Sequence, residues 1–408
     1  MTPRLSVIIP TRERSDVLIH TLRTLVSQNY VDCEIVISDN HSKDNTRKIV
    51  ESFSDSRIRY INTGRRISMS ANWEFALNHV RGAYVTCLGD DDGFIPDALA
   101  RAMSLLETSK ADALVWEKIE YCWPDYAIEN MKNWISLKNR EYSIQVIHGR
   151  KKLRQVIRGR EAYTKLPCLY NGIIRKALID RLKSNSINGV LFNSIAPDVF
   201  SGIVLSQVVE SYLCTDYPFS VNGASRHSTG ISFMRQPSGS SHNTPKGQFL
   251  NENQCKYDQR ILISPSILSI VMGEYMQAKR YLPSLCLPEP SWRKYVLTLI
   301  KISNNSSLAN EILQSAAHTV KEVGLWIRVP KCCSNIPPTP ATPKGFVSER
   351  FNLTAPASMV NNIYDACQFV SGMLPDFGDL ATFTPFQIFV RRLKANILSS
   401  LRDFYRSL

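Results

Sequence analysis

Three consecutive aspartates, Asp90, Asp91 and Asp92, directly follow the apolar run 84–88, which predicts a buried strand. Adjacent carboxylates repel one another and raise each other's pKa unless a cation lies among them. Their hard oxygen atoms suit Mg²⁺ or Mn²⁺, with the remaining ligands coming from a diphosphate and water. Aspartate is also favoured in solvated turns, so this cluster alone leaves a metal site and an ordinary turn as alternatives.

Strands and helices alternate through the first hundred residues. Short β-branched runs are each followed by a helix-length amphipathic segment, which predicts an α/β fold with a mostly parallel sheet and helices on both faces. The expected strands are 5–9, 34–38, 58–62 and 84–88, and the expected helices are 17–28, 45–53, 70–80 and 96–107.

The carboxyl ends of these strands are expected to form one site, because ligands of open α/β sheets bind in the crevice beyond them. That rule gathers the polar segments that follow the four strands. These segments are 10–14, 38–40, 64–68 and 89–93.

Three ordered motifs carry a resemblance to a known family. They are LSVIIPTRER at 5–14, EIVISDNHSKDN at 34–45 and YVTCLGDDDG at 84–93. Together they closely resemble family 2 glycosyltransferases of the GT-A fold, well over about 4–105 and loosely over 106–235. The resemblance implies a Rossmann-like sheet and an inverting, divalent-metal-dependent transfer of a sugar from a nucleotide donor, which is usually a UDP-sugar. The acceptor would be a glycan or a lipid-linked saccharide.

Residues of the donor site follow from matching these motifs. The resemblance implies that Pro10 and Thr11 lie against the nucleoside, with Arg14 near its rim. Asp39 matches the aspartate that accepts a hydrogen from the base, as a carboxylate can from the N3–H of uracil. The alternative is that Asp39 only caps the turn at Asp44.

The diphosphate is expected to meet a second group of residues. Asn72 matches the asparagine that opens the helix before the metal strand, and Arg65 and Arg66 lie just upstream. A guanidinium there could grip a diphosphate in bidentate fashion, and we assign this role to Arg66. Either arginine could equally be a solvated loop charge.

The metal motif departs from the family pattern, which usually has aspartate at the first, third and fourth of its four positions. Counting back from Pro96 aligns Gly89 with the first aspartate. The resemblance then makes Asp91 or Asp92 the metal ligand and leaves Asp90 as the substitute contact to the ribose.

Inverting transfer also needs a carboxylate that takes a proton from the acceptor hydroxyl. In the family this base lies well beyond the metal motif, commonly at the start of a helix, and Asp198 in IAPDVFS at 195–201 fits that position. The alternative is a first-turn aspartate that only offsets the helix dipole, in which case the positive helix end would lower its pKa.

The segment GASRHSTG at 223–230 follows an apparent strand and contains one arginine and one histidine. Members of this fold often return a basic residue here to the metal or diphosphate. The resemblance therefore implies Arg226 on phosphate and His227 on the metal, although a lone histidine is more often an ordinary polar side chain.

The chain is expected to divide into two units, as its 408 residues allow. Residues 1–235 form the GT-A domain, with a nucleotide-sugar half at 1–105 and an acceptor half at 106–235. A loop or linker at 236–250 leads to a mainly helical region at 251–408. Its last segment, 386–408, predicts an amphipathic helix with arginines and a lysine beside an apolar stripe.

This terminal helix has three alternative uses. Most such helices pack against their own domain, whereas a basic amphipathic helix can also lie on the anionic inner leaflet of a membrane or mediate a homodimer. The N-terminus has no signal-peptide pattern, and no uncharged apolar stretch could span a bilayer. We therefore expect a cytoplasmic protein, with 386–408 as the one candidate contact to the inner face of the membrane.

Three rival classes are less favoured by the sequence than a glycosyltransferase. The net charge of +13 favours anionic partners, but no nucleic-acid-binding motif is visible, so no nucleic-acid partner is expected. A sugar nucleotidylyltransferase would open with a glycine-rich loop, and 5–14 contains no glycine. A catalytically dead scaffold is disfavoured because Asp91, Asp92 and Asp198 are all present.

Overall fold

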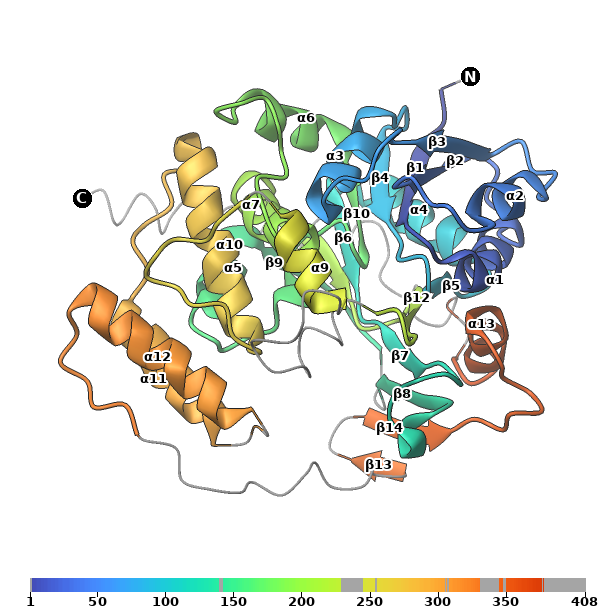
Figure 1. Ribbon diagram of the computed structural model, residues 1–408. Helices are drawn as coiled ribbons and strands as arrows, with labels where there is room; N and C mark the ends of the chain where they lie inside the picture. The colour runs from blue at the N-terminus through green and yellow to red at the C-terminus, as the bar shows by residue number, and fades with distance from the viewer. Residues whose placement is uncertain are drawn as a thin grey trace.

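The computed structural model describes residues 2–138, 142–228, 245–253, 255–304, 306, 308–330, 345–347, 350–375 and 377 (Figure 1). The predicted amphipathic helix at 386–408 lies outside these described residues. The same is true of 236–244 in the predicted linker, whereas 245–250 is part of a helix.

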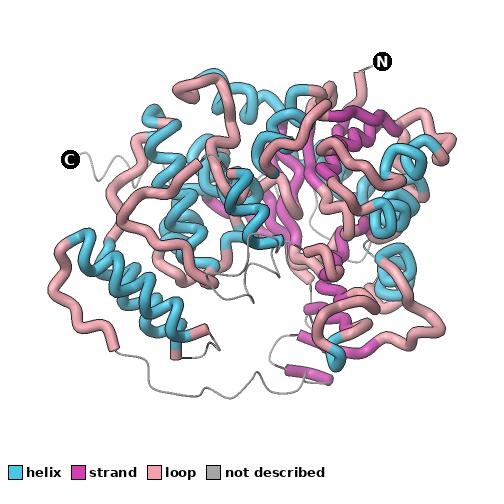
Figure 2. Tube along the Cα trace, in the orientation of Figure 1, coloured by secondary structure: helices cyan, strands magenta, loops and turns pink. Residues whose placement is uncertain are grey.

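An eight-stranded sheet forms the centre of the molecule, as Figure 2 shows in magenta. Its first four strands are parallel, and three of them are almost fully buried, as strands covered on both faces are, whereas the edge strand 58–62 is half-buried. Farther along, two strands run antiparallel to their neighbours, and the other six strands share one direction, so the sheet is mostly parallel as predicted. The order is β3 (Ile58–Asn62), β2 (Cys33–Asp39), β1 (Leu5–Thr11), β4 (Tyr84–Cys87), β10 (Gly172–Arg175), β6 (Ala113–Trp116), β11 (Ser211–Thr215) and β9 (Ile144–His148).

Helices cover both faces of this sheet, as predicted. Alternate side chains of β1 point to opposite sides, with Val7 in one core cluster and Ile8 in the other. The helices α1 (Ser15–Val26) and α4 (Ala98–Ser109) share the first cluster, and α3 (Met69–Asn78), α6 (Lys176–Ser184) and α7 (Pro197–Val208) share the second. The short α2 (Thr46–Glu51) joins β2 to β3.

A second, six-stranded sheet extends from the end of the aspartate cluster. Its β5 pairs with β12, and β12 in turn lies parallel to β7. This pairing carries the segment after β12 back to the aspartates. The order is β13 (Gly345–Val347), β14 (Arg350–Thr354), β8 (Trp134–Lys138), β7 (Ile119–Cys122), β12 (Ser220–Ala224) and β5 (Gly93–Phe94).

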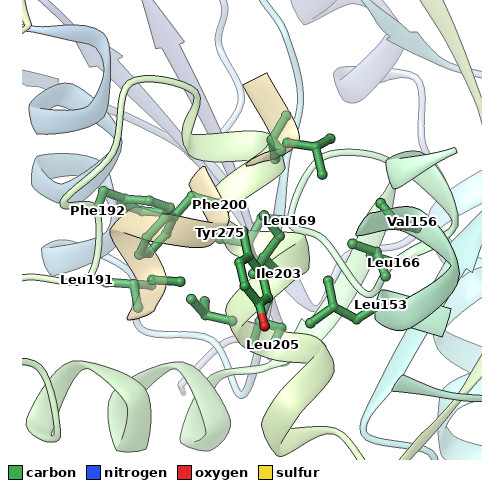
Figure 3. Close-up of a cluster of buried hydrophobic side chains, with 14 of the residues drawn as sticks. Leu153, Val156, Leu166, Leu169, Leu191, Phe192, Phe200, Ile203, Leu205 and Tyr275 are labelled. Atoms are coloured by element: carbon green, nitrogen blue, oxygen red, sulfur yellow. The ribbon is translucent and has the colours of Figure 1, made fainter. Parts of the chain in front are cut away.

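The region beyond residue 250 is mainly helical, as predicted. Its long helix α10 packs against α7 and α5 (Gly149–Ile157), where Figure 3 shows Tyr275 among side chains that include Phe200 and Ile203. The helical elements are α9 (Pro245–Glu252), α10 (Ile267–Tyr281), α11 (Trp292–Ser303), α12 (Ala309–Val323) and α13 (Ile363–Ser371), with short 3-10 turns at Glu129–Met131, Tyr163–Lys165 and Pro283–Leu285.

These C-terminal helices share cores with the N-terminal region. The side chains of α13 belong to the cluster that contains α1, beside which α13 lies in Figure 1, and those of α10 to α12 belong to the cluster that contains α7. The domain boundaries at 235 and 250 therefore stay a prediction. No helix in the described part of the chain is both long and apolar enough to cross a membrane.

Candidate functional site

The end of β1 and the aspartate cluster after β4 are joined through Asp90. Its carboxylate accepts a hydrogen bond from the Thr11 hydroxyl at 2.8 Å and forms an ion pair with Arg14 at 2.7 Å. The Thr21 hydroxyl donates to its backbone carbonyl at 2.8 Å. Burial raises the pKa of Asp90 even though Arg14 opposes the rise. Thr11, Arg14 and Asp90 are thus brought together as predicted neighbours.

Asp91 faces the segment that follows β12. One carboxylate oxygen accepts hydrogen bonds from the hydroxyls of Ser225, at 2.7 Å, and Ser228, at 2.8 Å. Its other oxygen, Oδ1, accepts none from the residues that the structure describes. Asp91 therefore keeps one oxygen atom available to a further ligand.

Asp92 is fully engaged within the protein. It accepts hydrogen bonds from the backbone N–H groups of Gly89, at 3.1 Å, and Gly223, at 2.7 Å, and from the hydroxyl of Tyr170. Burial raises the pKa of Asp92 to about 7, the charge of Asp91 adds to the rise, and these hydrogen bonds oppose it. These contacts fix the position of Asp92 within the cluster.

Two glycines make this close packing possible. A Cβ at Gly89 would lie 2.5 Å from the Asp92 carboxylate, and one at Gly223 would lie 1.9 Å from the Asp91 carbonyl oxygen. Either contact is far inside the van der Waals limit. Gly89, where the family usually has aspartate, thus gives Asp92 the space into which its carboxylate turns back.

The predicted nucleoside residues lie beside the aspartates at the same sheet edge. In the β1–β2 register, Pro10 is paired with Ser38 and Thr11 with Asp39. The Asp39 carboxylate accepts hydrogen bonds from the Ser42 N–H at 2.9 Å and from Tyr60 at 2.5 Å. The Ser42 contact is a turn cap, which the alternative interpretation anticipated.

Asn72 is held by the backbone of β2. Its side-chain carbonyl accepts from the Ser38 hydroxyl at 2.6 Å, and its amide donates to the Ser38 carbonyl at 3.1 Å. Both ends of this buried amide are therefore used to attach α3 to β2. Its contact with a diphosphate stays a prediction.

A carboxylate from α9 lies between two arginines of the donor side. Glu252 accepts from Arg12 at 2.6 Å and from Arg66 at 2.7 Å, although the two arginines follow different strands. Their convergence on one anion shows that this place can hold concentrated negative charge. Sequence analysis missed both Arg12 and Glu252, and the glutamate gave no local signal.

Arg226 and His227 turn toward α1 instead of toward the aspartates. Arg226 forms an ion pair with Asp16 at 3.2 Å and donates to the His227 ring at 3.0 Å. The His227 Nε2 lies 3.4 Å from Asp16. Only its backbone carbonyl reaches the cluster, through a hydrogen bond from Arg14. The structure therefore does not bring the His227 ring to Asp91 or Asp92.

Asp198 lies in the first turn of α7, directly after Pro197 at its start. Its carboxylate accepts a hydrogen bond from the Tyr163 hydroxyl at 2.9 Å. Burial raises the pKa of Asp198, although this hydrogen bond opposes the rise. Backbone N–H groups at the start of α7 also lower this pKa, as the helix-dipole alternative expects, but burial outweighs them. A raised pKa suits a group that must accept a proton.

Asp198 and the aspartate cluster share one electrostatic neighbourhood. After burial, the charges of Asp92, Asp198 and Asp90 all raise the pKa of the Cys87 thiol on β4. The Lys118 ammonium opposes the burial-driven rise in the pKa of both Asp92 and Asp198. Lys118 forms no ion pair within the described residues, so its charge faces the carboxylates without a fixed partner. Sequence analysis missed Lys118 because it lies in no motif.

A complete set of protein metal ligands is not assembled here. Among the described residues, no three His, Cys, Asp or Glu side chains are arranged to hold a metal ion. The donor atoms present are hard carboxylate oxygens, which fit Mg²⁺ or Mn²⁺. Burial, and after it the charge of Asp91, raises the pKa of Asp90 and of Asp92, and a bound cation would oppose that rise. A bound ion would need most of its ligands from a substrate and water.

The described fold is an α/β sheet with helices on both faces, an acidic cluster at its strand ends and a helical C-terminal region, as predicted. Residues 6–170 match the sequence model of glycosyl transferase family 2. Over these residues the chain is similar to that family.

Two curated proteins and one solved structure are similar to this chain. A Campylobacter jejuni GalNAc(5)-diNAcBac-PP-undecaprenol beta-1,3-glucosyltransferase is 35% identical over 25% of this chain and 34% of its own length. An Escherichia coli UDP-Glc:alpha-D-GlcNAc-diphosphoundecaprenol beta-1,3-glucosyltransferase is 28% identical over 30% and 46%. Staphylococcus aureus TarS 1–349 with UDP-GlcNAc gives a TM-score of 0.42 at 14% identity, covering 80% of this chain and 93% of that one. The chain thus spans less than half of these two curated relatives.

Proposed function

We propose that this protein is an inverting, metal-dependent glycosyltransferase that moves a sugar from a UDP-sugar to a hydroxyl of a glycan or lipid-linked saccharide. The observation that carries the proposal is the convergence of the strand-end aspartates with Asp198. They belong to two segments more than a hundred residues apart, yet the charges of Asp92 and Asp198 both raise the pKa of the Cys87 thiol, and the Lys118 ammonium opposes the burial-driven rise in the pKa of both carboxyls. Inverting transfer requires one acidic group for the leaving diphosphate and another for the attacking hydroxyl.

The donor would bind along the carboxyl ends of β1, β2 and β4. Pro10, Thr11 and Asp39 are adjacent in the strand register, which supports a nucleoside subsite there. The Asp39 carboxylate can accept the N3–H of uracil, because a carboxylate offers about four acceptor positions and three hydrogen bonds from the protein are present. Asp90, fixed by Thr11 and Arg14, is our candidate for the ribose contact.

The diphosphate would lie between Asp91 and the two arginines that now hold Glu252. The free Oδ1 of Asp91 supports it as the first metal ligand, with Asp92 beside it. When bound, Mg²⁺ or Mn²⁺ would stabilise the negative charge that develops on the leaving diphosphate. Arg12 and Arg66 would bind the remaining phosphate oxygens. Arg226 and His227 could reach this site only by leaving Asp16.

Asp198 would act as the catalytic base. The acceptor hydroxyl gives its proton to the Asp198 carboxylate as its oxygen attacks the anomeric carbon, while the bond from that carbon to the phosphate oxygen breaks on the opposite face. The product therefore has the inverted configuration. Burial, which raises the pKa of Asp198, makes it a stronger base than an exposed aspartate.

The names of the relatives suggest the class of acceptor. Both curated glucosyltransferases described above act on saccharides linked through a diphosphate to undecaprenol. We infer a similar lipid-linked acceptor, and membrane contact through 386–408 remains a separate proposal based on its sequence pattern alone. Cosedimentation of full-length and 1–385 protein with anionic liposomes at low and high salt tests that contact.

A donor panel tests the proposed function. Purified protein is incubated with UDP-, dTDP- and GDP-sugars and Mn²⁺, and slow donor hydrolysis and thermal stabilisation are measured. We expect a UDP-sugar to raise the Tm and to release UDP. The same protein with UTP and a sugar 1-phosphate tests the nucleotidylyltransferase alternative through pyrophosphate release. Stabilisation by none of the nucleotide sugars would overturn the proposal.

A further inference from the structure

Glu274 is a buried acid next to the proposed base. It lies on α10, outside the region that matches the family, and its side chain has no exposure to solvent. Its Oε1 accepts three hydrogen bonds, from the N–H groups of Ile195 at 2.9 Å and Ala196 at 2.6 Å and from the Tyr257 hydroxyl at 2.6 Å. One oxygen atom thus ties three segments of the chain together.

The two backbone N–H groups belong to the entry of α7. Ala196 is the residue before this helix, and its own side chain cannot cap it. Glu274 therefore fixes, from another helix, the short segment that precedes Asp198. Because Asp198 is two residues beyond Ala196, a shift of this segment would move its carboxylate.

A purely structural role explains this arrangement poorly. The second oxygen of Glu274, Oε2, is buried and has no hydrogen-bond partner within the described residues. A buried polar atom without a partner costs about 1–3 kcal/mol, which an apolar side chain in the same place would avoid. This unfavourable free energy is consistent with a glutamate that is retained because it fixes the entry of α7.

We propose that Glu274 is a positioning residue for the transfer reaction, holding the backbone at 195–196 so that Asp198 is aimed at the acceptor hydroxyl. This inference rests on the proposed function of Asp198. Glu274 itself cannot contact a substrate, because it is enclosed on all sides. The C-terminal helices would then contribute to catalysis although they lie outside the family region.

The ionisation of Glu274 supplies an independent readout. Burial raises its pKa to about 8, the hydrogen bonds oppose the rise, and the charge of Asp198 adds to it. The titratable groups that face it are Asp198 from α7 and Tyr257 and Cys255 from the segment before α10. A carboxyl with a raised pKa destabilises the fold as pH rises from its unfolded value through about 8. Glu274→Gln, which stays neutral, should therefore flatten the fall in Tm over that range.

Three variants and a matched control test the proposal in the full chain. Glu274→Gln keeps an oxygen acceptor and should keep kcat near pH 7. Glu274→Leu removes this acceptor, and Glu274→Asp shortens the side chain so that its oxygen atoms lie farther from the N–H groups at 195–196. Both should lower kcat by about 10²-fold while the KM for the donor changes less than about twofold, as expected for a misplaced group. The control is Gln277→Leu, which removes a buried hydrogen bond to Lys256 from the same helix.

Hydrogen exchange separates this inference from the proposed function. The amides of 195–196 should exchange faster in Glu274→Leu than in wild type or Gln277→Leu, whether or not the protein is a transferase. If exchange rises but no nucleotide sugar is bound or turned over by the wild-type protein, the proposed function fails and the positioning contact stands; if exchange rises but Asp198→Asn is fully active, only the base role of Asp198 fails. The inference would be overturned if Glu274→Leu and Glu274→Asp both kept the wild-type exchange rates and kcat. It would also be overturned if Gln277→Leu lost as much kcat as Glu274→Leu. If Glu274→Leu does not fold, Glu274→Asp and the Tm profile of Glu274→Gln decide.

Discussion

The two sides of the candidate site are built in different ways. On the donor side, residues of neighbouring parallel strands hold one another, as Thr11 and Arg14 hold Asp90. On the acceptor side, Asp198 depends on Tyr163 and, through the backbone, on Glu274, which come from separate helical segments. A site at the strand ends can therefore be predicted from local sequence motifs. The position of the proposed base, Asp198, depends instead on packing between distant parts of the chain.

The two sides also differ in how their charges are balanced. Asp90 has an arginine partner at hydrogen-bond distance, and Asp91 and Asp92 receive hydroxyl and backbone donors. Asp198 has one hydroxyl donor, backbone N–H groups of its own helix turn and the charge of Lys118, but no arginine ion pair among the described residues. We therefore expect mutations on the donor side to act through ligand binding and those on the acceptor side to act through proton transfer.

The largest effect should come from Asp91→Ala and Asp92→Ala. Both should abolish transfer, because losing charge stabilisation of this kind typically costs about 10²–10³-fold in kcat and here would also weaken metal binding. Asp92→Ala should also lower stability by about 1–3 kcal/mol for each donor left unpaired. Turnover with titrated Mn²⁺ and chemical denaturation measure the two effects.

Asp16→Ala is the matched control, because Asp16 is a nearby acid that pairs with Arg226 and His227 rather than with the cluster. It should retain turnover. Near-normal activity of both cluster variants in the presence of EDTA would contradict the metal mechanism.

Asp198→Asn should have the second largest effect on turnover. It tests whether the acceptor side acts through proton transfer and not through ligand binding. The amide keeps the shape and can still accept from Tyr163, but it cannot take the proton, so kcat should fall by about 10²–10⁴-fold. Donor binding, measured by calorimetry with UDP, should be unchanged. Lost UDP affinity with normal turnover of the bound donor would make Asp198 a binding residue instead.

The same contrast explains how much the sequence could predict. The strand 58–62 was predicted to the residue, and the expected helix 70–80 corresponds to α3, where the Ser68 side chain caps the first turn through the Ala71 N–H. Local signals suffice there because periodicity and caps act within one element. The helix expected at 96–107 begins two residues later, since α4 starts at Ala98 after a left-handed Asp97.

Features that depend on tertiary contacts could not be predicted. The antiparallel β10 separates β4 from β6, and nothing in its four residues encodes that position. Glu274 and Glu252 are ordinary helical residues by pattern, and only the packing of α10 and α9 brings them to the site. The individual roles assigned to the site residues, including His227, stay predictions.

Lys118→Met should have a moderate effect on the pH dependence of turnover, in one direction only. Removing a positive charge raises the pKa of Asp198 further, so the base is deprotonated only at higher pH. The acid limb of the kcat/KM profile should move to higher pH, with activity at pH 6 falling by about threefold or more. Lys118→Arg, which keeps the charge, should restore the wild-type limb. An unmoved limb in Lys118→Met would show that this charge does not reach the base.

The smallest effect should come from Glu252→Gln, which tests whether the donor side already holds a substitute for the diphosphate. Arg12, Arg66 and Glu252 are all partly exposed, and such pairs contribute about 0.2–1 kcal/mol. Because a diphosphate must displace this carboxylate, the amide should lower the donor KM by about two- to fivefold at low salt, and high salt should remove the difference. Glu51→Gln is the control, since Glu51 forms an exposed pair with Arg47 on a different helix. If Glu252→Gln leaves the donor KM unchanged at low salt, the diphosphate does not bind between Arg12 and Arg66. The proposed position of the diphosphate would then move toward Arg14.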